Sequence, residues 1–297
     1  ARLLALAETH HHFAFSDSNE RPDKYSRFKW LCGWSAAEIL ESNSQSFAAL
    51  KKFHQQHKDW CLGHLSFNLK NEVENLSSRH REEFSYPNLS FFIPQTVVYE
   101  SEDGIICESL EFETVAELLE SLPAAPVFKK AKLPPFRQTL PRNEYLEKIK
   151  GLKEELQYGN IYEINFCMEL KAEGEIAPAE VFYQLNKRHN APFTAFYKLE
   201  HRHLLCFSPE RYLQKRGAQL ISQPIKGTAA RAATEELDRQ QKEKLYNSEK
   251  ERAENVMIVD LVRNDLSRTA ARGSVKVPEL FGIYTFNAVH QMISTVE

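Results

Sequence analysis

The sharpest change in hydrophobic pattern along the chain lies between residues 142 and 170. Apolar residues recur there at spacings of three and four, which predicts a helix with one apolar stripe that ends at Gly159. The stripe consists of Leu146, Ile149, Leu152 and Leu156. From Tyr162 to Leu170 the period changes to two. This predicts a strand whose polar face, with Glu163 and Asn165, lines either solvent or a cavity.

Similar patterns predict the remaining elements. Helices are expected around Ser46–His54, after Pro178, after Thr234, and from the capping box at Ser248 to about Asn264. Strands are expected at Leu89–Phe92, Thr96–Tyr99, Thr194–Leu199, His203–Phe207, Arg211–Lys215, Ala218–Ser222, Ser274–Phe281 and Tyr284–Val296, and a loop at Gln223–Arg231. Helices mixed with mostly adjacent strands indicate an α+β or layered α/β domain rather than a Rossmann fold.

A concentration of prolines divides the chain. Residues 123–141 hold five of the 13 prolines, and proline fixes φ and lacks a backbone donor, so this stretch is typical of an extended connector. We therefore expect an N-terminal region at 1–122, a connector at 123–141 and a C-terminal domain at 142–297.

Composition narrows the class of protein. A chain of 297 residues that is 42% hydrophobic, with a formal net charge of −3, is typical of a globular protein and has no basic field for nucleic acid. Its ten glycines form no phosphate-binding loop. The five cysteines lie far apart without metal-ligand spacing, which predicts reduced thiols in a cytoplasmic protein. No apolar window approaches the ~18 residues of a membrane span.

Lys226 is the first candidate for chemistry. It stands between Pro224 and Gly227 in the predicted loop. Such a lysine is either a solvated surface residue or a nucleophile whose amine is activated by burial or by a nearby cation.

Two acidic residues are further candidates. Glu254 shares a predicted core-facing helix stripe with Ile258, Leu261 and Asp265, so it either forms a salt bridge or holds Mg²⁺ together with a substrate. Glu210, at a strand junction, is either a surface acid paired with Arg211 or an acid/base group.

Several short sequence motifs follow one another along the chain. They are Gly159–Asn165, Asn190–Phe193, Ser208–Arg211, Pro224–Thr228, Glu254–Asp265 and Gly273–Phe281, with weaker ones at Phe15–Ser18 and Gly63–Asn68. This order resembles the chorismate-utilising enzymes, which include anthranilate synthase component I, aminodeoxychorismate synthase component I, and isochorismate and salicylate synthases. A lysine at position 226 makes the chain similar to the aminodeoxychorismate synthase component I branch of the family. Anthranilate synthases carry alanine at this position.

The resemblance implies an α+β fold of four layers, α/β/β/α, with two orthogonally packed sheets, incomplete at the C-terminus. It implies that Lys226 attacks C2 of chorismate as the C4 hydroxyl departs. Ammonia from a glutamine amidotransferase subunit would then displace the lysine and give 4-amino-4-deoxychorismate, toward 4-aminobenzoate and folate. Glu210 would be the general acid/base and Glu254 a Mg²⁺ ligand, and Gly227 and Thr228 would offer backbone contacts to the substrate.

Relatives also hold tryptophan in a pocket between the N-terminal strands and the Asn-x-Pro-Phe segment. The resemblance implies that Ser18, Pro192 and Phe193 line such a pocket here. Core packing explains Pro192 and Phe193 equally well.

The chain departs from the family at four positions. Gln291, not His290, aligns with the usual C-terminal histidine, and adjacent strand residues face opposite ways, so an amide would supply the leaving-group hydrogen bond. Asn160, Glu163 and Asn68 replace the usual Asp, Gln and Asp. Isochorismate and salicylate synthases place a water-activating lysine at the position of Glu163, which argues against simple hydration of the substrate.

Family members continue for about another 130–160 residues, which is consistent with a two-domain size. That segment carries a substrate-carboxylate arginine and a second Mg²⁺ glutamate. We therefore expect a polypeptide ending at Glu297 to turn over no chorismate. The alternatives are anthranilate synthase component I, and a truncated, non-catalytic homologue that acts as a binding module.

Overall fold

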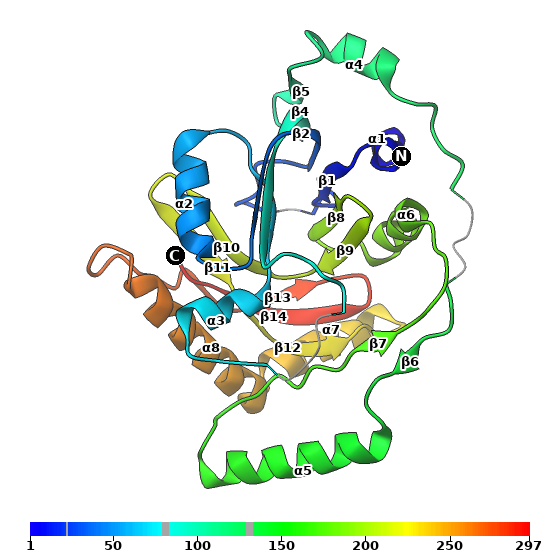
Figure 1. The fold of residues 1–297 in the computed structure, drawn as a ribbon. Coiled ribbons are helices and arrows are strands. Elements are labelled where there is room, and N and C mark those ends of the chain that lie inside the picture. The colour runs from blue at the N-terminus through cyan, green and yellow to red at the C-terminus, as the bar shows by residue number, and fades with distance from the viewer. Residues whose placement is uncertain (22, 79–82, 129–132) are drawn as a thin grey trace. The chain divides into compact units, whose positions relative to one another are not determined.

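The computed structural model describes residues 1–21, 23–78, 83–128 and 133–297 (Figure 1). These residues form two compact units, each assembled from two stretches of chain. Unit 1 takes the described residues of Ala1–Lys129 and Pro178–Arg211, and unit 2 takes those of Lys130–Ala177 and Tyr212–Glu297. Both units combine helices with antiparallel strands, so the predicted α+β class is confirmed.

Unit 1 is built on an antiparallel sheet of strand order β3-β4-β2-β1-β8-β9, with β5 also paired to β4. Its strands are β1 (His12–Asp17), β2 (Trp30–Ser42), β3 (Leu62–Leu65), β4 (Leu89–Ser101), β5 (Gly104–Ser109), β8 (Phe193–Leu199) and β9 (Arg202–Ser208). Its helices are α1 (Arg2–Thr9), α2 (Ser46–Gln56), the 3₁₀ turn η1 (Phe67–Leu69), α3 (Lys70–Val73), α4 (Val115–Ser121) and α6 (Pro178–His189).

The core of unit 1 lies between this sheet and the helices α1, α4 and α6. Phe13, Phe182 and Phe196 are fully buried there, and their rings pack edge to face. The predicted strands Leu89–Phe92 and Thr96–Tyr99 are one strand, β4, because its long neighbour β2 supplies backbone partners on both sides of Pro94.

The grouping into units differs from the three consecutive regions expected from the proline distribution. Residues 178–211 lie in unit 1 because β8 pairs antiparallel with β1, which places Phe15 opposite Phe196. Within the expected connector, residues 129–132 lie outside the described part. The described remainder contains no helix and one short strand, β6 (Arg137–Gln138).

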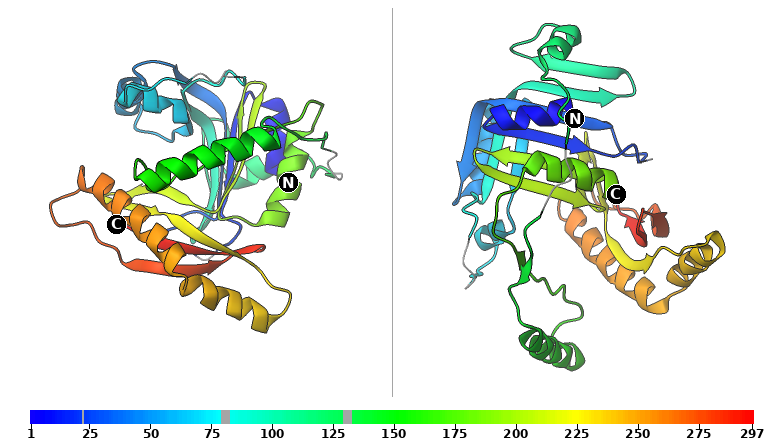
Figure 2. Two further views of the ribbon diagram at one scale, coloured as in Figure 1. Left: turned by 90° about the horizontal axis from the view of Figure 1, so that it is seen from below. Right: turned by 90° about the vertical axis from the view of Figure 1, so that its right-hand side faces the viewer.

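Unit 2 contains the three-stranded antiparallel sheet β12-β14-β13 and two helices that pack on it (Figure 2). Its elements besides β6 are α5 (Arg142–Tyr158), β7 (Leu170–Lys171), β10 (Arg211–Arg216), β11 (Gln219–Gln223), β12 (Ile225–Ala230), α7 (Glu235–Tyr246), α8 (Glu249–Ser267), β13 (Glu279–Thr285) and β14 (Val289–Thr295). Alternate residues of β14 face the helices: His290 and Met292 contact α7, and Ser294 contacts α8.

Several predicted elements of unit 2 are confirmed. The helix predicted to end at Gly159 is α5, and Gly159 closes it in a left-handed conformation (φ 78°) that glycine adopts without strain. The hydroxyls of Thr234 and Ser248 accept backbone hydrogen bonds at the starts of α7 and α8, as predicted. Helix α8 ends at Ser267 rather than near Asn264.

The strand predicted at Tyr162–Leu170 and the predicted core-facing stripe of α8 are both wrong. Of the strand expected at Tyr162–Leu170, only the last residue is in a strand, β7, because the short β6 is the one backbone partner within the described residues. The core-facing stripe of α8 consists of Asn255, Val259 and Leu266 rather than Glu254, Ile258, Leu261 and Asp265. Leu261 is 54% exposed, since the helix is turned by about one residue from the predicted orientation.

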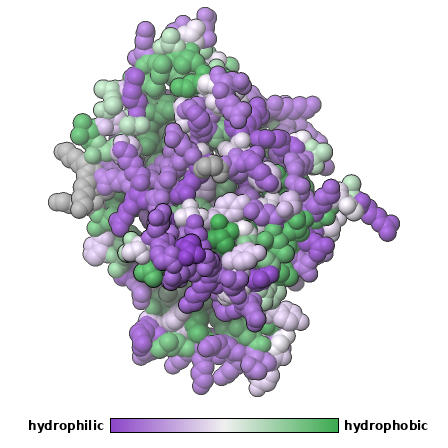
Figure 3. All heavy atoms as spheres, turned by 180° about the vertical axis from the view of Figure 1, so that it is seen from behind, coloured by the Kyte–Doolittle hydropathy of each residue, from purple (hydrophilic) through white to green (hydrophobic). Residues whose placement is uncertain are grey.

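Exposed apolar side chains occur in both units, and on the face seen in Figure 3 green apolar patches lie scattered among purple polar side chains. Within the described ranges, no helix has both the length and the apolar character that crossing a bilayer requires.

Candidate active site

Lys226 lies on a strand and not at the tip of a loop. The loop predicted at Gln223–Arg231 is wrong for most of its length, because Ile225–Ala230 pair with β14. The register slips by one residue between Ile225 and Thr228, which places a bulge at Lys226 and Gly227.

Gly227 makes this bulge possible. Its φ of +96° is a conformation that side chains rarely adopt, and a Cβ built there would lie 3.2 Å from Cβ of Glu251 on α8. The glycine therefore lets β12 approach the helix closely while the strand changes register.

The Lys226 ammonium is held by two side chains of the segment that precedes β7. It forms an ion pair with the Glu163 carboxylate and donates a hydrogen bond to Oδ1 of Asn165 at 3.1 Å. The side chains of Lys226 and Glu163 are 19% and 22% exposed, so the pair is largely withdrawn from water. The period-two pattern had placed Glu163 and Asn165 on one polar face, but nothing in the sequence indicated that this face meets Lys226.

Two buried side-chain oxygen atoms of unit 2 lack a donor among the described residues. Oε2 of Glu163 and Oε1 of Gln291 have no hydrogen-bond partner among the described residues. Gln291 lies opposite Thr228 in the β12–β14 ladder. A buried acceptor without a donor is unfavourable, and a bound molecule with N–H or O–H groups relieves it.

Asn255 fixes the backbone beneath Lys226. It is 1% exposed, and its Nδ2 donates to the carbonyl oxygens of Lys226 and Met292, each at 3.4 Å. Its Oδ1 accepts from the hydroxyl of Ser294 at 2.6 Å. Asn255 thereby ties both strands to α8. Asn255 was not among the predicted site residues, although an amide two turns into a helix, next to the candidate Glu254, was a visible signal.

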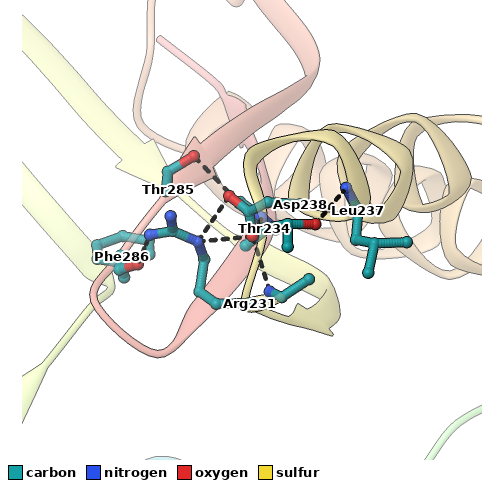
Figure 4. A network of polar contacts seen from close by, with 8 residues as sticks. Arg231, Thr234, Leu237, Asp238, Thr285 and Phe286 are labelled. Atoms are coloured by element: carbon teal, nitrogen blue, oxygen red, sulfur yellow. Dashed lines mark hydrogen bonds and ion pairs between the residues drawn. The ribbon is translucent and has the colours of Figure 1, made fainter.

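His290 belongs to a structural network on the helix-facing side of β14. It is fully buried; its Nε2 lies 2.9 Å from Oδ1 of Asp238 and its Nδ1 lies 3.1 Å from the hydroxyl of Thr285. Arg231 and the N–H of Ala232 also bind Asp238 (Figure 4). These contacts, led by the Arg231 hydrogen bond, lower the pKa of Asp238. Because alternate residues face opposite sides of a strand, Gln291 points away from this network.

Glu254 lies half-buried on α8, and its carboxylate is 3.2 Å from the Lys250 ammonium. Within the part of the chain that the structure describes, no group of three or more His, Cys, Asp or Glu side chains gathers to hold a metal. Mg²⁺ is commonly bound by one or two carboxylates together with the substrate. Glu254 fits that mode, because Lys250 is 72% exposed and can leave it.

The other predicted site residues lie in unit 1. Glu210 stands between β9 and β10, where its backbone N–H donates to Oγ of Ser208. Its neighbour Arg211 forms an ion pair with Asp23.

The predicted tryptophan-pocket residues also lie in unit 1. The guanidinium of Arg211 stacks 4.9 Å from the ring centroid of Phe193. The backbone N–H of Ser18 donates to the carbonyl of Lys29. The amide of Asn19 donates to the carbonyl of Ala191, next to Pro192. The role of Ser18, Pro192 and Phe193 stays a prediction.

Comparison with known proteins places this arrangement in a family. A family model described as chorismate binding enzyme matches residues 8–297. The chain therefore belongs to the chorismate binding enzyme family, and the resemblance found in the motifs is confirmed.

Individual relatives refine the comparison. The chain is 43% identical over 161 residues to aminodeoxychorismate synthase component 1 of Klebsiella aerogenes, which covers 54% of this chain and 36% of the relative. It is 28% identical over 248 residues to anthranilate synthase component 1 of Thermus thermophilus, covering 80% and 54%. The chain thus spans between about a third and about half of the length of these two relatives.

The crystal structure of anthranilate synthase component I from Streptococcus pneumoniae TIGR4 matches with a TM-score of 0.77 at 17% identity, over 93% of this chain and 69% of that one. At this identity the match shows the fold, and the predicted chorismate-enzyme fold is confirmed.

Proposed function

We propose that the complete protein is an aminodeoxychorismate synthase component I, which converts chorismate and ammonia to 4-amino-4-deoxychorismate for 4-aminobenzoate and folate synthesis. The observation that carries the proposal is the Lys226 amine, withdrawn from water and oriented by Glu163 and Asn165 beside the bulge of β12. The relatives named aminodeoxychorismate synthase component 1 support the same reaction. The component naming also supports a second subunit, for which we propose a glutamine amidotransferase that delivers ammonia.

In the proposed reaction the neutral amine of Lys226 forms a bond to C2 of chorismate. Both ring double bonds shift, and the C4 hydroxyl leaves as water with a proton from a general acid, for which Glu210 is our candidate. Ammonia then forms a bond at C4, both double bonds shift back, and the bond between C2 and the lysine breaks. The product ammonium returns a proton to Glu210, so ammonia has replaced the hydroxyl and water is released.

The remaining proposed groups bind and orient the substrate. The backbone of Gly227 and Thr228 would contact the substrate, and the Gln291 amide would hydrogen-bond the departing hydroxyl. Mg²⁺ bound by Glu254 would neutralise the substrate's ring carboxylate. The tryptophan site at Ser18, Pro192 and Phe193 is proposed as a separate ligand site in unit 1.

The test incubates the complete gene product with chorismate, Mg²⁺ and ammonium. We expect 4-aminobenzoate only after a lyase is added, and a loss of nearly all turnover in Lys226→Ala. Direct fluorescence of anthranilate would instead support anthranilate synthase component I. That alternative is favoured by the 80% of this chain that aligns with the Thermus thermophilus enzyme. No turnover of chorismate at all would favour the non-catalytic binding module.

A further inference from the structure

We propose that Glu163 is the proton acceptor that makes Lys226 nucleophilic. The inference rests on the proposed function, in which the lysine nitrogen must bond to carbon. An ammonium has no lone pair, so a proton must leave Nζ before this bond forms. Glu163 is the group of the described chain that touches Nζ and is able to take that proton.

Nζ of Lys226 contacts two side chains that differ in whether they can take up a proton. Oδ1 of Asn165 accepts a hydrogen bond at 3.1 Å, but an amide oxygen does not take up a proton near neutral pH. The Glu163 carboxylate forms the ion pair with the same nitrogen and accepts a proton readily. Asn165 therefore orients the amine, and Glu163 alone of the two supplies a base.

The surroundings of the pair keep both side chains largely out of water. Both side chains are about four-fifths buried, and burial penalises two separate charges relative to a neutral amine and a neutral carboxylic acid. Oε2 of Glu163 is buried and has no donor among the described residues, so part of the stabilisation that an ionised carboxylate receives is missing. Glu251, the titratable neighbour on α8, lies beside Gly227 and is paired with Lys250.

The proton balance closes over one turnover. One proton moves from Nζ of Lys226 to Oε1 of Glu163, and the freed lone pair forms the bond to the ring carbon. Glu163 keeps this proton while ammonia replaces the lysine. When the bond between lysine and carbon breaks, the neutral amine is regenerated and takes its proton back from Glu163.

The experiment compares four forms of the complete gene product: wild type, Glu163→Gln, Glu163→Asp and Asn165→Ser. Formation of 4-amino-4-deoxychorismate is measured from pH 6 to 10. Glu163→Gln keeps the size and the hydrogen bonding of the side chain, so we expect kcat to fall about 10²-fold or more at neutral pH, with little change in KM for chorismate. The deficit should shrink as pH rises, because solvent then removes the amine proton.

Glu163→Asp keeps a carboxylate and should recover part of kcat, whereas Asn165→Ser should lower kcat without changing the shape of the pH profile. Thermal unfolding of each variant checks that it is folded.

Wild-type kcat and pH profile in Glu163→Gln would overturn the inference while leaving the proposed function standing. A loss of rate in Glu163→Gln with an unchanged pH profile, or no recovery of kcat in Glu163→Asp, would show that Glu163 only positions the amine. Either result would also overturn the inference. A wild-type protein that forms no 4-amino-4-deoxychorismate would refute the proposed function, and the inference with it.

Discussion

Replacing Asn255 by alanine should destabilise unit 2 selectively. The substitution removes the 2.6 Å hydrogen bond from Ser294 and the two 3.4 Å contacts to the carbonyls of Lys226 and Met292. Ser294 is fully buried, so water cannot readily replace the lost partner. The short bond is worth about 1–1.5 kcal/mol, the two long ones together about 1 kcal/mol, and the newly unpaired groups about 1 kcal/mol more. We therefore expect the free energy of unfolding to fall by about 3 kcal/mol.

Urea unfolding followed by far-ultraviolet circular dichroism measures this loss. Tryptophan fluorescence is a poor probe of it, because the three tryptophans, Trp30, Trp34 and Trp60, all lie in unit 1. Hydrogen exchange localises the effect: amides of β12 and β14 should exchange faster, while those of β2 and β4 stay unchanged.

Asn264→Ala is the matched control, because Asn264 lies on the same helix with an exposed side chain. We expect it to change stability by about 0.5 kcal/mol or less. An Asn255→Ala variant as stable as this control, or one whose faster exchange is spread evenly over both units, would refute the reasoning.

Three further predictions concern residues of unit 2. Gly227→Ala should destabilise the protein by about 1–3 kcal/mol in urea unfolding, because alanine is strained at a φ of +96° and its Cβ approaches Glu251; a neutral effect would contradict the bulge. The hydrogen bond from Arg231 lowers the pKa of the Asp238 carboxyl in the folded protein. The ionised carboxylate therefore stabilises the fold at pH values above its ordinary pKa of ~3.9, and this stabilisation is lost as pH falls through the lower folded-state pKa. The stability difference between wild type and Asp238→Asn should therefore stay constant from pH 7 to 5 and shrink below pH 4; a difference that grows in acid contradicts this. Chelation with EDTA, or Glu254→Ala at limiting Mg²⁺, should abolish turnover by the complete gene product, and excess Mg²⁺ should rescue only the chelated enzyme; turnover that persists without Mg²⁺ excludes the metal role.

The sequence by itself determined those helix ends that depend only on residues close by in the chain. Gly159, Thr234 and Ser248 act within one turn of their own helices, so the ends of α5, α7 and α8 followed from neighbouring residues. The motif order around Lys226 also determined the family, because it depends on residue identity and not on contacts.

Tertiary structure decided what depends on partners distant in the chain. Pro224 and Gly227 indicated a loop, yet Ile225–Ala230 became a strand because β14, about 65 residues later, supplies the backbone hydrogen bonds. The alternation at 162–170 indicated a strand but could not supply one, since a strand exists only where a neighbour pairs with it. The contact between Glu163 and Lys226 joins residues 63 positions apart, and only the fold brings that carboxylate to that amine.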